Sequence, residues 1–429
     1  MSRAIVLRGD AARLPLPDAS ADLIICSPPY YGLRSYTDGG EHYAGQIGSE
    51  ATPSAYLEAL WLCTGEWVRV LKPSGSLFVN LGDKYNSGPG DVGGNSDALD
   101  YHLRKGKSAA QHLNGDRARK LNASVGPKSL LGLPWRYALG CMDQLGLILR
   151  AEVIWEKPNG LPESVTDRVR RSHEQVFHFT RQPRYYSAVD EVREPAAYGM
   201  PNSPGRIKSP YGQGYSRRAA ETDYRVDREH HAVNPLGKLP GSVWSIPSAP
   251  LTVPAHLGVD HFAAYPPELC RRIILGWSPR EVCTGCGEGR RPVSVIEAEK
   301  LTGSHGTRRG FGFIDGSEPQ GNTRGINAPS APRLRHSVTI TGYACACPDT
   351  TAPATPGIVL DPFGGTGTTA LVAAVHGRIG VTVDRSADYC KLARWRVADP
   401  GERARALDVP KPPPVSDGQQ ALFSLGEVL

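Results

Sequence analysis

Short apolar runs separated by polar breaks recur along the first part of the chain. The runs at 4–9, 21–27 and 75–83 have the length and composition of buried strands. Between the last two, the stretch 53–73 has apolar residues at helical spacing and meets Pro73 and Gly75, which stop helices. This order predicts strands that alternate with a helix.

The same alternation returns further along. A helix and then a strand are predicted over 133–158, a strand over 173–187, a short strand over 242–247, and a helix with a proline-rich first turn over 265–279. The stretch 357–397 predicts strand, glycine loop, helix, strand and helix. Strands that alternate with helices favour an α/β fold with a mostly parallel central sheet.

Polar, Gly-rich or basic stretches interrupt this pattern and divide the chain. A single compact domain rarely exceeds roughly 250–300 residues, so the 429 residues predict a core with inserted loops. The predicted parts are 1–83 (first half of the core), 84–128 (flexible loop), 129–187 (core), 188–240 (insertion), 241–279 (core helix region), 280–350 (cysteine-containing insertion), 351–398 (second half of the core) and 399–429 (flexible tail).

Charge and hydropathy narrow the class of protein. The formal net charge of +6 permits a nucleic-acid partner without demanding one. No apolar run reaches the roughly 18 residues of a membrane-spanning helix, and residues 1–18 lack the apolar centre of a signal peptide. We therefore expect a cytoplasmic protein with no membrane partner.

A glycine-rich loop, "DPFGGTGTT", joins a predicted strand to a predicted helix. Gly364, Gly365 and Gly367 have no Cβ, so a ligand can approach the backbone closely. No lysine follows the last glycine, so the loop is not a Walker P-loop. Asp384 ends the next predicted strand, where an acid can accept hydrogen bonds from two ribose hydroxyls. The alternative interpretation is a tight strand–helix turn with an incidental acid.

The stretch "SPPY" (27–30) leaves a buried strand through two prolines. Prolines fix φ and lack N–H donors, so the carbonyls and the Ser27 hydroxyl become fixed hydrogen-bond acceptors. These acceptors can hold an exocyclic amino group while the Tyr30 ring stacks on the base that carries it. Cys26, next to Ser27, is interpreted as a buried strand residue.

With "SPPY" and "DPFGGTGTT", the sequence resembles the amino-group DNA methyltransferases, which methylate N4 of cytosine or N6 of adenine with S-adenosylmethionine. The "SPPY" stretch precedes the glycine loop, as in the permuted β-type order. The stretches 9–36, 71–83, 153–186 and 261–279 resemble the same family. The resemblance implies a Rossmann-like, S-adenosylmethionine-dependent methyltransferase fold.

The resemblance also implies roles for residues. Ser27, Pro28, Pro29 and Tyr30 would form the catalytic pocket, and S-adenosylmethionine would lie against Asp361, Pro362, Phe363, Gly364, Gly365, Thr366, Gly367 and Asp384. Asp10, Phe262 and Pro266 are either part of the same pocket or purely structural.

The implied activity is methyl transfer to a base flipped out of duplex DNA. A serine at the first position of the motif resembles N4-cytosine enzymes, and N6-adenine methylation is the alternative. An RNA or small-molecule methyltransferase and a zinc DNA-binding protein with an inactive methylation centre are alternatives from other classes. A bacterial or phage source and a cognate restriction endonuclease as partner fit this class, and the oligomeric state stays open.

Two cysteine pairs, "CTGC" and "CAC", bracket a basic, Gly-rich stretch. Cys283, Cys286, Cys345 and Cys347 can supply four thiolates to one structural zinc. The alternative is two unrelated turns with free thiols, and His305 is a candidate substitute ligand. The stretch between the pairs either contacts the DNA backbone or is a solvated loop.

Target recognition is expected within 188–240, where arginines are interleaved with tyrosines. Arginine can read guanine edges and neutralise phosphates. The alternative is an unstructured insertion. Arg168, Arg170 and Arg171 either line the DNA groove or make intramolecular contacts.

Overall fold

The computed structural model describes residues 3–33, 37–38, 41–42, 45–86, 125–160, 162–163, 165–194, 236–259, 265–300, 334–349 and 351–412. The chain divides into two units. The larger consists of Met1–Val192, Gly241–Arg291 and Ala344–Leu429, and the smaller of Arg193–Pro240 and Pro292–Tyr343.

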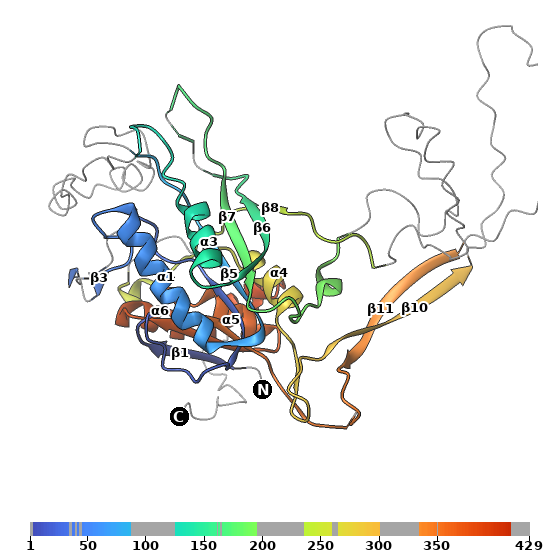
Figure 1. Cartoon of the computed structure of the whole chain (residues 1–429). Coiled ribbons are helices and arrows are strands. Elements are labelled where there is room, and N and C mark those ends of the chain that lie inside the picture. The colour runs from blue at the N-terminus through green and yellow to red at the C-terminus, as the bar shows by residue number, and fades with distance from the viewer. Residues whose placement is uncertain are drawn as a thin grey trace, which may run out of the picture. The chain divides into compact units, whose positions relative to one another are not determined.

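The larger unit is built on an eight-stranded sheet (Figure 1). Its strands, in spatial order, are β1 (Ala4–Arg8), β14 (Ile379–Asp384), β13 (Ile358–Asp361), β2 (Ala21–Cys26), β5 (Leu71–Leu81), β7 (His173–Thr180), β6 (Ile148–Glu156) and β8 (Val243–Ser245). The first five pair in parallel, β7 is antiparallel to both of its neighbours, and β8 is parallel to β6. The prediction of an α/β fold with a mostly parallel sheet is confirmed.

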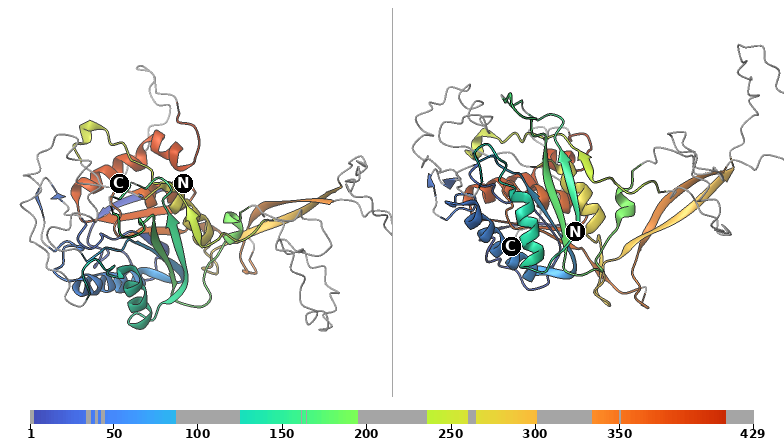
Figure 2. Two further views of the ribbon diagram at one scale, coloured as in Figure 1. Left: turned by 90° about the horizontal axis from the view of Figure 1, so that it is seen from above. Right: turned by 45° about the horizontal axis from the view of Figure 1, so that its top comes forward.

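Helices cover both faces of this sheet (Figure 2). On one face lie α1 (Pro53–Val70) and α3 (Leu133–Asp143), and on the other lie α4 (Pro267–Trp277) and α5 (Thr368–Val375). Strand β2 is buried along its whole length because its residues pack on both sides. Ile24 belongs to the core that contains α1 and α3, whereas Leu23 and Ile25 belong to the core that contains α4 and α5.

The larger unit contains further helices and strands. They are β3 (Thr37–Asp38), β4 (Glu41–His42), η3 (Val189–Val192), η5 (Ala255–Leu257), β9 (Val282–Cys283), β12 (Ala354–Thr355) and α6 (Ala387–Ala398). No helix among the described ranges has both the length and the apolar character needed to cross a membrane.

The predicted end of the helix over 53–73 is wrong. Helix α1 ends at Val70, and Leu71 is already extended and opens β5. The ladder between β2 and β5 is irregular between the pairs Ala21–Leu71 and Leu23–Ser76, and Pro73 lies within this irregular stretch. A proline is tolerated there because an irregular stretch does not require its missing N–H.

The predicted flexible tail begins with a helix instead. Helix α7 (Pro400–Ala406) follows Asp399, whose carboxylate accepts a hydrogen bond from the Glu402 N–H at 2.8 Å. Ala406 is buried in the same core as α4 and α5. The remainder of the predicted tail, from 413 onward, lies outside the described residues.

In the smaller unit, β10 (Arg291–Lys300) and β11 (Leu334–Ala344) form a two-stranded sheet and run in opposite directions (Figure 1). Glu194 and Lys238 pair through their backbones, and their side chains form an ion pair at 3.2 Å. Residues 87–124 of the predicted flexible loop (84–128) and residues 195–235 of the predicted recognition insertion (188–240) lie outside the described residues, as does His305.

The packing of α5 against β14 gives a direct test of the fold. A Cβ at Gly380 would lie 2.3 Å from the Ala370 carbonyl oxygen and 2.6 Å from the Ala370 Cα. These are backbone atoms that cannot rotate away, so Gly380→Ala is expected to lower the free energy of unfolding by roughly 1–3 kcal/mol in urea denaturation. Gly241→Ala is the control, since no atom lies within 4 Å of its added Cβ. Equal stability of the two variants would contradict this packing.

Candidate active site

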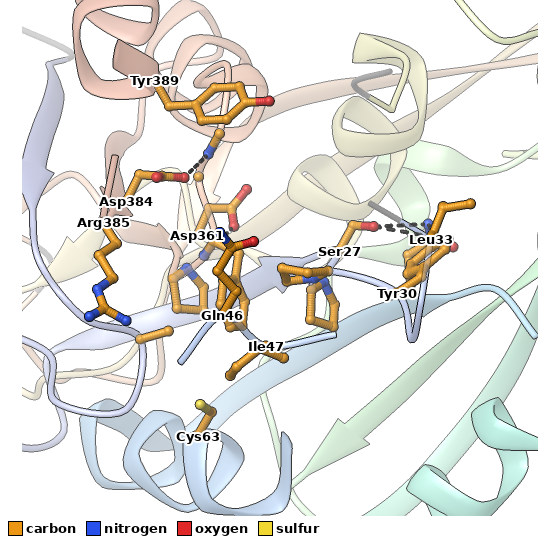
Figure 3. Close-up of a pocket in the computed structure, with 18 of the residues that line it drawn as sticks. Ser27, Tyr30, Leu33, Gln46, Ile47, Cys63, Asp361, Asp384, Arg385 and Tyr389 are labelled. Carbon is orange, nitrogen blue, oxygen red and sulfur yellow. Dashed lines mark hydrogen bonds between the residues drawn. The ribbon is translucent and has the colours of Figure 1, made fainter. Parts of the chain in front are cut away.

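A cavity of about 630 Å³ opens where β1, β14, β13 and β2 end (Figure 3). Each of these adjacent parallel strands brings one polar side chain to the cavity, either at its last residue or just beyond it. These side chains are Asp10, Asp384, Asp361 and Ser27. In α/β sheets, ligands bind at this carboxyl edge, and the volume is in the usual range of a small-molecule pocket.

The glycine loop between β13 and α5 forms one wall of the cavity. Gly364 lies so close to β14 that an added Cβ would be 1.4 Å from the Thr382 Oγ1. Gly365 and Gly367 have φ values of +47° and +76°, which favour glycine. The loop therefore requires glycines for its own packing and conformation.

Asp384 fixes this loop from the neighbouring strand. Its Oδ2 accepts a hydrogen bond from the Gly365 N–H at 2.8 Å, and its Oδ1 accepts one from the Ser386 N–H at 2.9 Å. Asp384 thus shapes the loop in addition to lining the cavity.

A buried arginine supports the loop from behind. The Arg396 Nη1 of α6 donates to the Thr366 Oγ1 at 2.8 Å and to the Thr368 Oγ1 at 2.6 Å. Its Nε pairs with the Glu402 Oε2 at 2.8 Å, which compensates the buried charge. Helices α6 and α7 are therefore coupled to the loop through one guanidinium group.

Asp361 is a buried carboxylate with an unusual pKa. It is 2% exposed, and its Oδ2 accepts hydrogen bonds from the Tyr265 hydroxyl at 2.6 Å and the Thr369 hydroxyl at 2.7 Å. Burial raises the pKa of Asp361 to about 6, although these hydrogen bonds act in the opposite direction. The group can therefore take up or release a proton near neutral pH.

The "SPPY" turn follows β2 and is held by several hydrogen bonds. The Tyr30 hydroxyl donates to the Glu174 Oε2 at 2.8 Å and accepts from the Asn80 Nδ2 at 2.8 Å and, more weakly, from the Ser27 Oγ at 3.3 Å. The Tyr56 hydroxyl donates to the Pro29 carbonyl oxygen at 2.9 Å. The turn is therefore anchored at both its aromatic and its backbone atoms.

Glu174 is the centre of this network. Its carboxylate pairs with Lys157, and its Oε2 also accepts a hydrogen bond from Asn80 at 2.8 Å. Burial alone would raise the pKa of Glu174, but the Lys157 charge and the hydrogen bonds outweigh burial, so the pKa is lowered. The pKa of the Tyr30 hydroxyl is raised by burial and by the Glu174 charge, which keeps it a hydrogen-bond donor.

Most of the predicted site residues line this one cavity. They are Asp10, Ser27, Pro28, Pro29, Tyr30, Asp361, Pro362, Phe363, Gly364, Gly365, Thr366 and Asp384. Gly367 lies at the N-cap of α5 instead. Pro266 does not line the cavity, because it is the N-cap residue of α4, and Tyr265 beside it reaches the cavity. Phe262 lies outside the described residues.

Sequence reasoning missed Asn80, Lys157, Glu174, Tyr265 and Arg396. Asn80 lies in the apolar second half of β5, "LFVNL", and such a buried polar residue requires a partner, which is a usable signal. The partner cannot be identified from the sequence, because Glu174 is far away along the chain. Cys26 is fully buried, as predicted.

Three of the four predicted metal ligands come together. The sulfurs of Cys283, Cys286 and Cys345 lie within 4.8 Å of one another, and Cys347 is not part of this group. All four cysteines are free thiols.

The basic stretch at 168–171 makes intramolecular contacts. The Arg168 Nη1 pairs with the Glu163 Oε2 at 2.6 Å, and its guanidinium lies 3.8 Å from the centre of the Tyr85 ring. Arg170 and Arg171 donate to the carbonyl oxygens of Gly160 and Asp83.

Comparisons with known proteins show which proteins the sequence is similar to. The family model described as DNA methylase, of the N6/N4 type, matches residues 21–282, which is more than half of the chain. Type II methyltransferase M.XycI of Xanthomonas campestris pv. cyanopsidis is 38% identical over 200 residues, which are 45% of this chain and 60% of that protein. Type II methyltransferase M.SmaI of Serratia marcescens is 31% identical over 257 residues, which are 60% of this chain and 68% of that protein.

One similar solved structure is titled PvuII DNA methyltransferase (cytosine-N4-specific). The match covers 94% of this chain and 89% of that chain, with 14% sequence identity and a TM-score of 0.47. This score is too low to support a fold assignment, which depends instead on the strand order given above. The family-model match shows that the chain belongs to the N6/N4 DNA methylase family.

The Glu174 network predicts a pH-dependent loss of stability. A lowered pKa means that Glu174 stabilises the fold above its unfolded-state pKa and loses this effect as the pH falls through its folded pKa. Glu174→Gln should lower the free energy of unfolding by roughly 2–4 kcal/mol at pH 7, because Lys157 loses its charged partner. The deficit relative to wild type should narrow towards pH 4 in urea denaturation.

Glu58→Gln, at an exposed position of α1, is the matched control and should change little at either pH. A deficit of Glu174→Gln that stays constant between pH 7 and pH 4 would contradict the ionised state assigned to Glu174.

Proposed function

We propose that the protein is an S-adenosylmethionine-dependent DNA methyltransferase that methylates the exocyclic N4 of cytosine. The observation that carries the proposal is that the "SPPY" turn and the glycine loop, from opposite parts of the chain, line one cavity. Strands β2 and β13 are neighbours in the sheet, so Ser27 and Asp361 lie side by side along its edge (Figure 3).

The lining of the cavity fits a cationic cofactor with a nucleoside part. Asp10, Asp361 and Asp384 gather carboxylates at one end, and S-adenosylmethionine carries a sulfonium and an ammonium group. The Asp384 carboxylate would accept hydrogen bonds from the ribose hydroxyls. The backbone of the glycine loop would lie close to the methionine part of the cofactor. Phe363 and Ile47 supply apolar surface beside them.

The cofactor would supply an electrophilic methyl group: its sulfur–methyl bond would break as the nitrogen–methyl bond forms, which leaves a neutral thioether, and the amino group would lose one proton to solvent. The protein positions the acceptor. The Ser27 hydroxyl and the carbonyls of the "SPPY" turn accept hydrogen bonds from the exocyclic amino group, which directs the nitrogen lone pair towards the methyl group. Tyr30 remains protonated and tied to Glu174, so it acts as a stacking surface and not as a base. The base reaches the cavity only after it leaves the DNA stack.

Cytosine is the proposed target because Ser27 occupies the first position of the motif, as in N4-cytosine enzymes. Adenine N6 is the second candidate. The curated relatives are named type II methyltransferases, and the match covers only about three fifths of M.XycI. We therefore propose that the protein acts in the cytoplasm as part of a restriction–modification system. Its methylation would protect cellular DNA against a cognate endonuclease.

The primary test is transfer of labelled methyl from S-adenosylmethionine to duplex DNA, followed by mass spectrometry of the nucleosides. N4-methylcytosine is expected. N6-methyladenine would keep the reaction class and overturn the target base. Label in RNA but not in DNA would overturn the DNA assignment.

The Ser27 hydroxyl gives a sharper test of the acceptor site. Ser27→Ala should lower kcat by roughly ten- to a hundred-fold, because loss of one oriented hydrogen bond misplaces the amino group. Cofactor Kd, measured by calorimetry, should change less than about two-fold, since Ser27 lies outside the glycine loop. Ser54→Ala, at an exposed position of α1, is the control and should match wild type in both measurements. An unchanged kcat in Ser27→Ala would contradict the role of the Ser27 hydroxyl in holding the amino group.

Binding of S-adenosylmethionine should be coupled to the protonation of Asp361. The pKa of Asp361 is about 6 in the free protein, and a nearby cationic ligand lowers it. Binding at pH 6 should therefore release part of a proton, whereas at pH 8 this group is already ionised. Calorimetry at pH 6 in buffers with different ionisation enthalpies measures this release.

Asp361→Asn should release fewer protons than wild type when the cofactor binds at pH 6, because an amide has no proton to give up in this range. At pH 8 the two proteins should release the same amount. Proton release at pH 6 that is identical in wild type and Asp361→Asn would show that the cationic groups of the cofactor do not reach Asp361.

A further inference from the structure

We propose that one structural zinc ion is held by Cys283, Cys286, Cys345 and Cys347. The ion would join the two ends of the segment 287–344, which contains β10 and β11. The proposal is independent of methyl transfer, because none of these four cysteines lines the cavity.

The geometry of the first three sulfurs suits a tetrahedral ion. Cys283, Cys286 and Cys345 place their sulfurs within 4.8 Å of one another. With zinc–sulfur bonds of about 2.3 Å, the sulfurs of a tetrahedral site are roughly 3.8 Å apart. The three thiols therefore need only a small contraction to reach bonding distance. Cys286 is exposed and Cys345 is partly exposed, so an ion can enter.

The Cys347 sulfur lies near the turn that carries Cys283 and Cys286. A Cβ at Gly285 would lie 3.6 Å from the Cys347 sulfur and 3.7 Å from the Cys283 sulfur. Both sulfurs thus border Gly285, although Cys347 lies outside the group of three sulfurs within 4.8 Å, so it has to move closer to become the fourth ligand.

The polypeptide around the cysteines is already brought together. Strand β9 pairs with β12, and the Thr284 N–H and hydroxyl donate to the Pro353 carbonyl oxygen at 2.9 and 2.8 Å. The Arg290 Nη2 donates to the Ala352 carbonyl oxygen at 2.6 Å. The chain leaves for β10 just after Cys286 and returns from β11 just before Cys345.

This region has too little apolar surface to be stabilised by burial alone. Its paired strands are two residues long, and its buried apolar side chains are Val282, Cys283 and Ala352. Segments with so small a core are commonly stabilised by disulfides or a metal, and all four cysteines are free thiols. Four thiolates in tetrahedral arrangement select zinc or iron among common metals.

The test measures metal in the full-length protein, purified under reducing conditions without chelator. Elemental analysis should find one zinc per chain. Cys286→Ala and Cys345→Ala should each lower zinc affinity by at least about a hundred-fold, because each removes one of four ligands. Cys141→Ala is the matched control, since it removes a buried thiol of α3 and should keep one zinc.

Cobalt substitution then counts the sulfur ligands. The thiolate-to-cobalt absorption of wild type should correspond to four thiolates, and that of Cys347→Ala to three. An unchanged cobalt spectrum in Cys347→Ala would overturn the role of Cys347. Zinc retained at full occupancy by Cys286→Ala, bound iron in place of zinc, or a disulfide found by alkylation and mass spectrometry would overturn the zinc site.

The zinc site and the proposed reaction can fail separately. Cofactor Kd, measured by calorimetry on Cys286→Ala, should stay within about two-fold of wild type, because the cysteines lie apart from the cavity. Zinc content is read without any methyl-transfer assay. A ten-fold or larger loss of cofactor affinity would contradict a zinc ion that stabilises only the segments next to the cysteines.

Discussion

The geometry of the site depends on close packing of the glycine loop and α5 against β14. Gly364 lies against the Thr382 side chain, and Gly380 lies against the backbone of α5, so the glycine loop and the following helix rest directly on this strand. Asp384, the last residue of β14, then holds the Gly365 N–H. Because β13 lies between β14 and β2, the position of β14 fixes the loop relative to the "SPPY" turn. Closer packing is possible here only because no side chains intervene.

Two carboxyl groups that line the cavity, Asp361 and Glu174, have pKa values shifted in opposite directions by their surroundings. Among the described residues, the hydrogen-bond partners of Asp361 are hydroxyl and N–H groups, and burial prevails, so its pKa rises. Glu174 has a lysine as partner, and the ion pair prevails, so its pKa falls. One end of the cavity can therefore change its charge near neutral pH, while the network that holds Tyr30 stays ionised. A carboxyl group whose charge can change and a carboxylate kept ionised by a lysine are thus combined within one pocket.

The parts of the fold that follow from local pattern could be predicted from the sequence. The alternation of strands and helices, the buried strand before Ser27 and the glycine loop before α5 agree with the structure, since each depends on neighbouring residues. The end of α1 was misplaced because Leu71 enters the sheet by pairing with Ala21, a tertiary contact that outweighs the signals of Pro73 and Gly75. Glu174, Lys157 and Arg396 were missed because their partners are distant in sequence and are brought near only by the sheet order.

That sheet order has a consequence for how the protein is made. Strands β1 and β2 are synthesised before β13 and β14, although β14 and β13 lie between them in the sheet. While the ribosome is still producing the middle of the sequence, β2 has one unpaired edge. Pairing across such sequence separations is slow, and open strand edges invite wrong partners. The sheet can therefore close between β1 and β2 only after β13 and β14 have been made, and a chain that stops short of them contains the "SPPY" turn without the glycine loop.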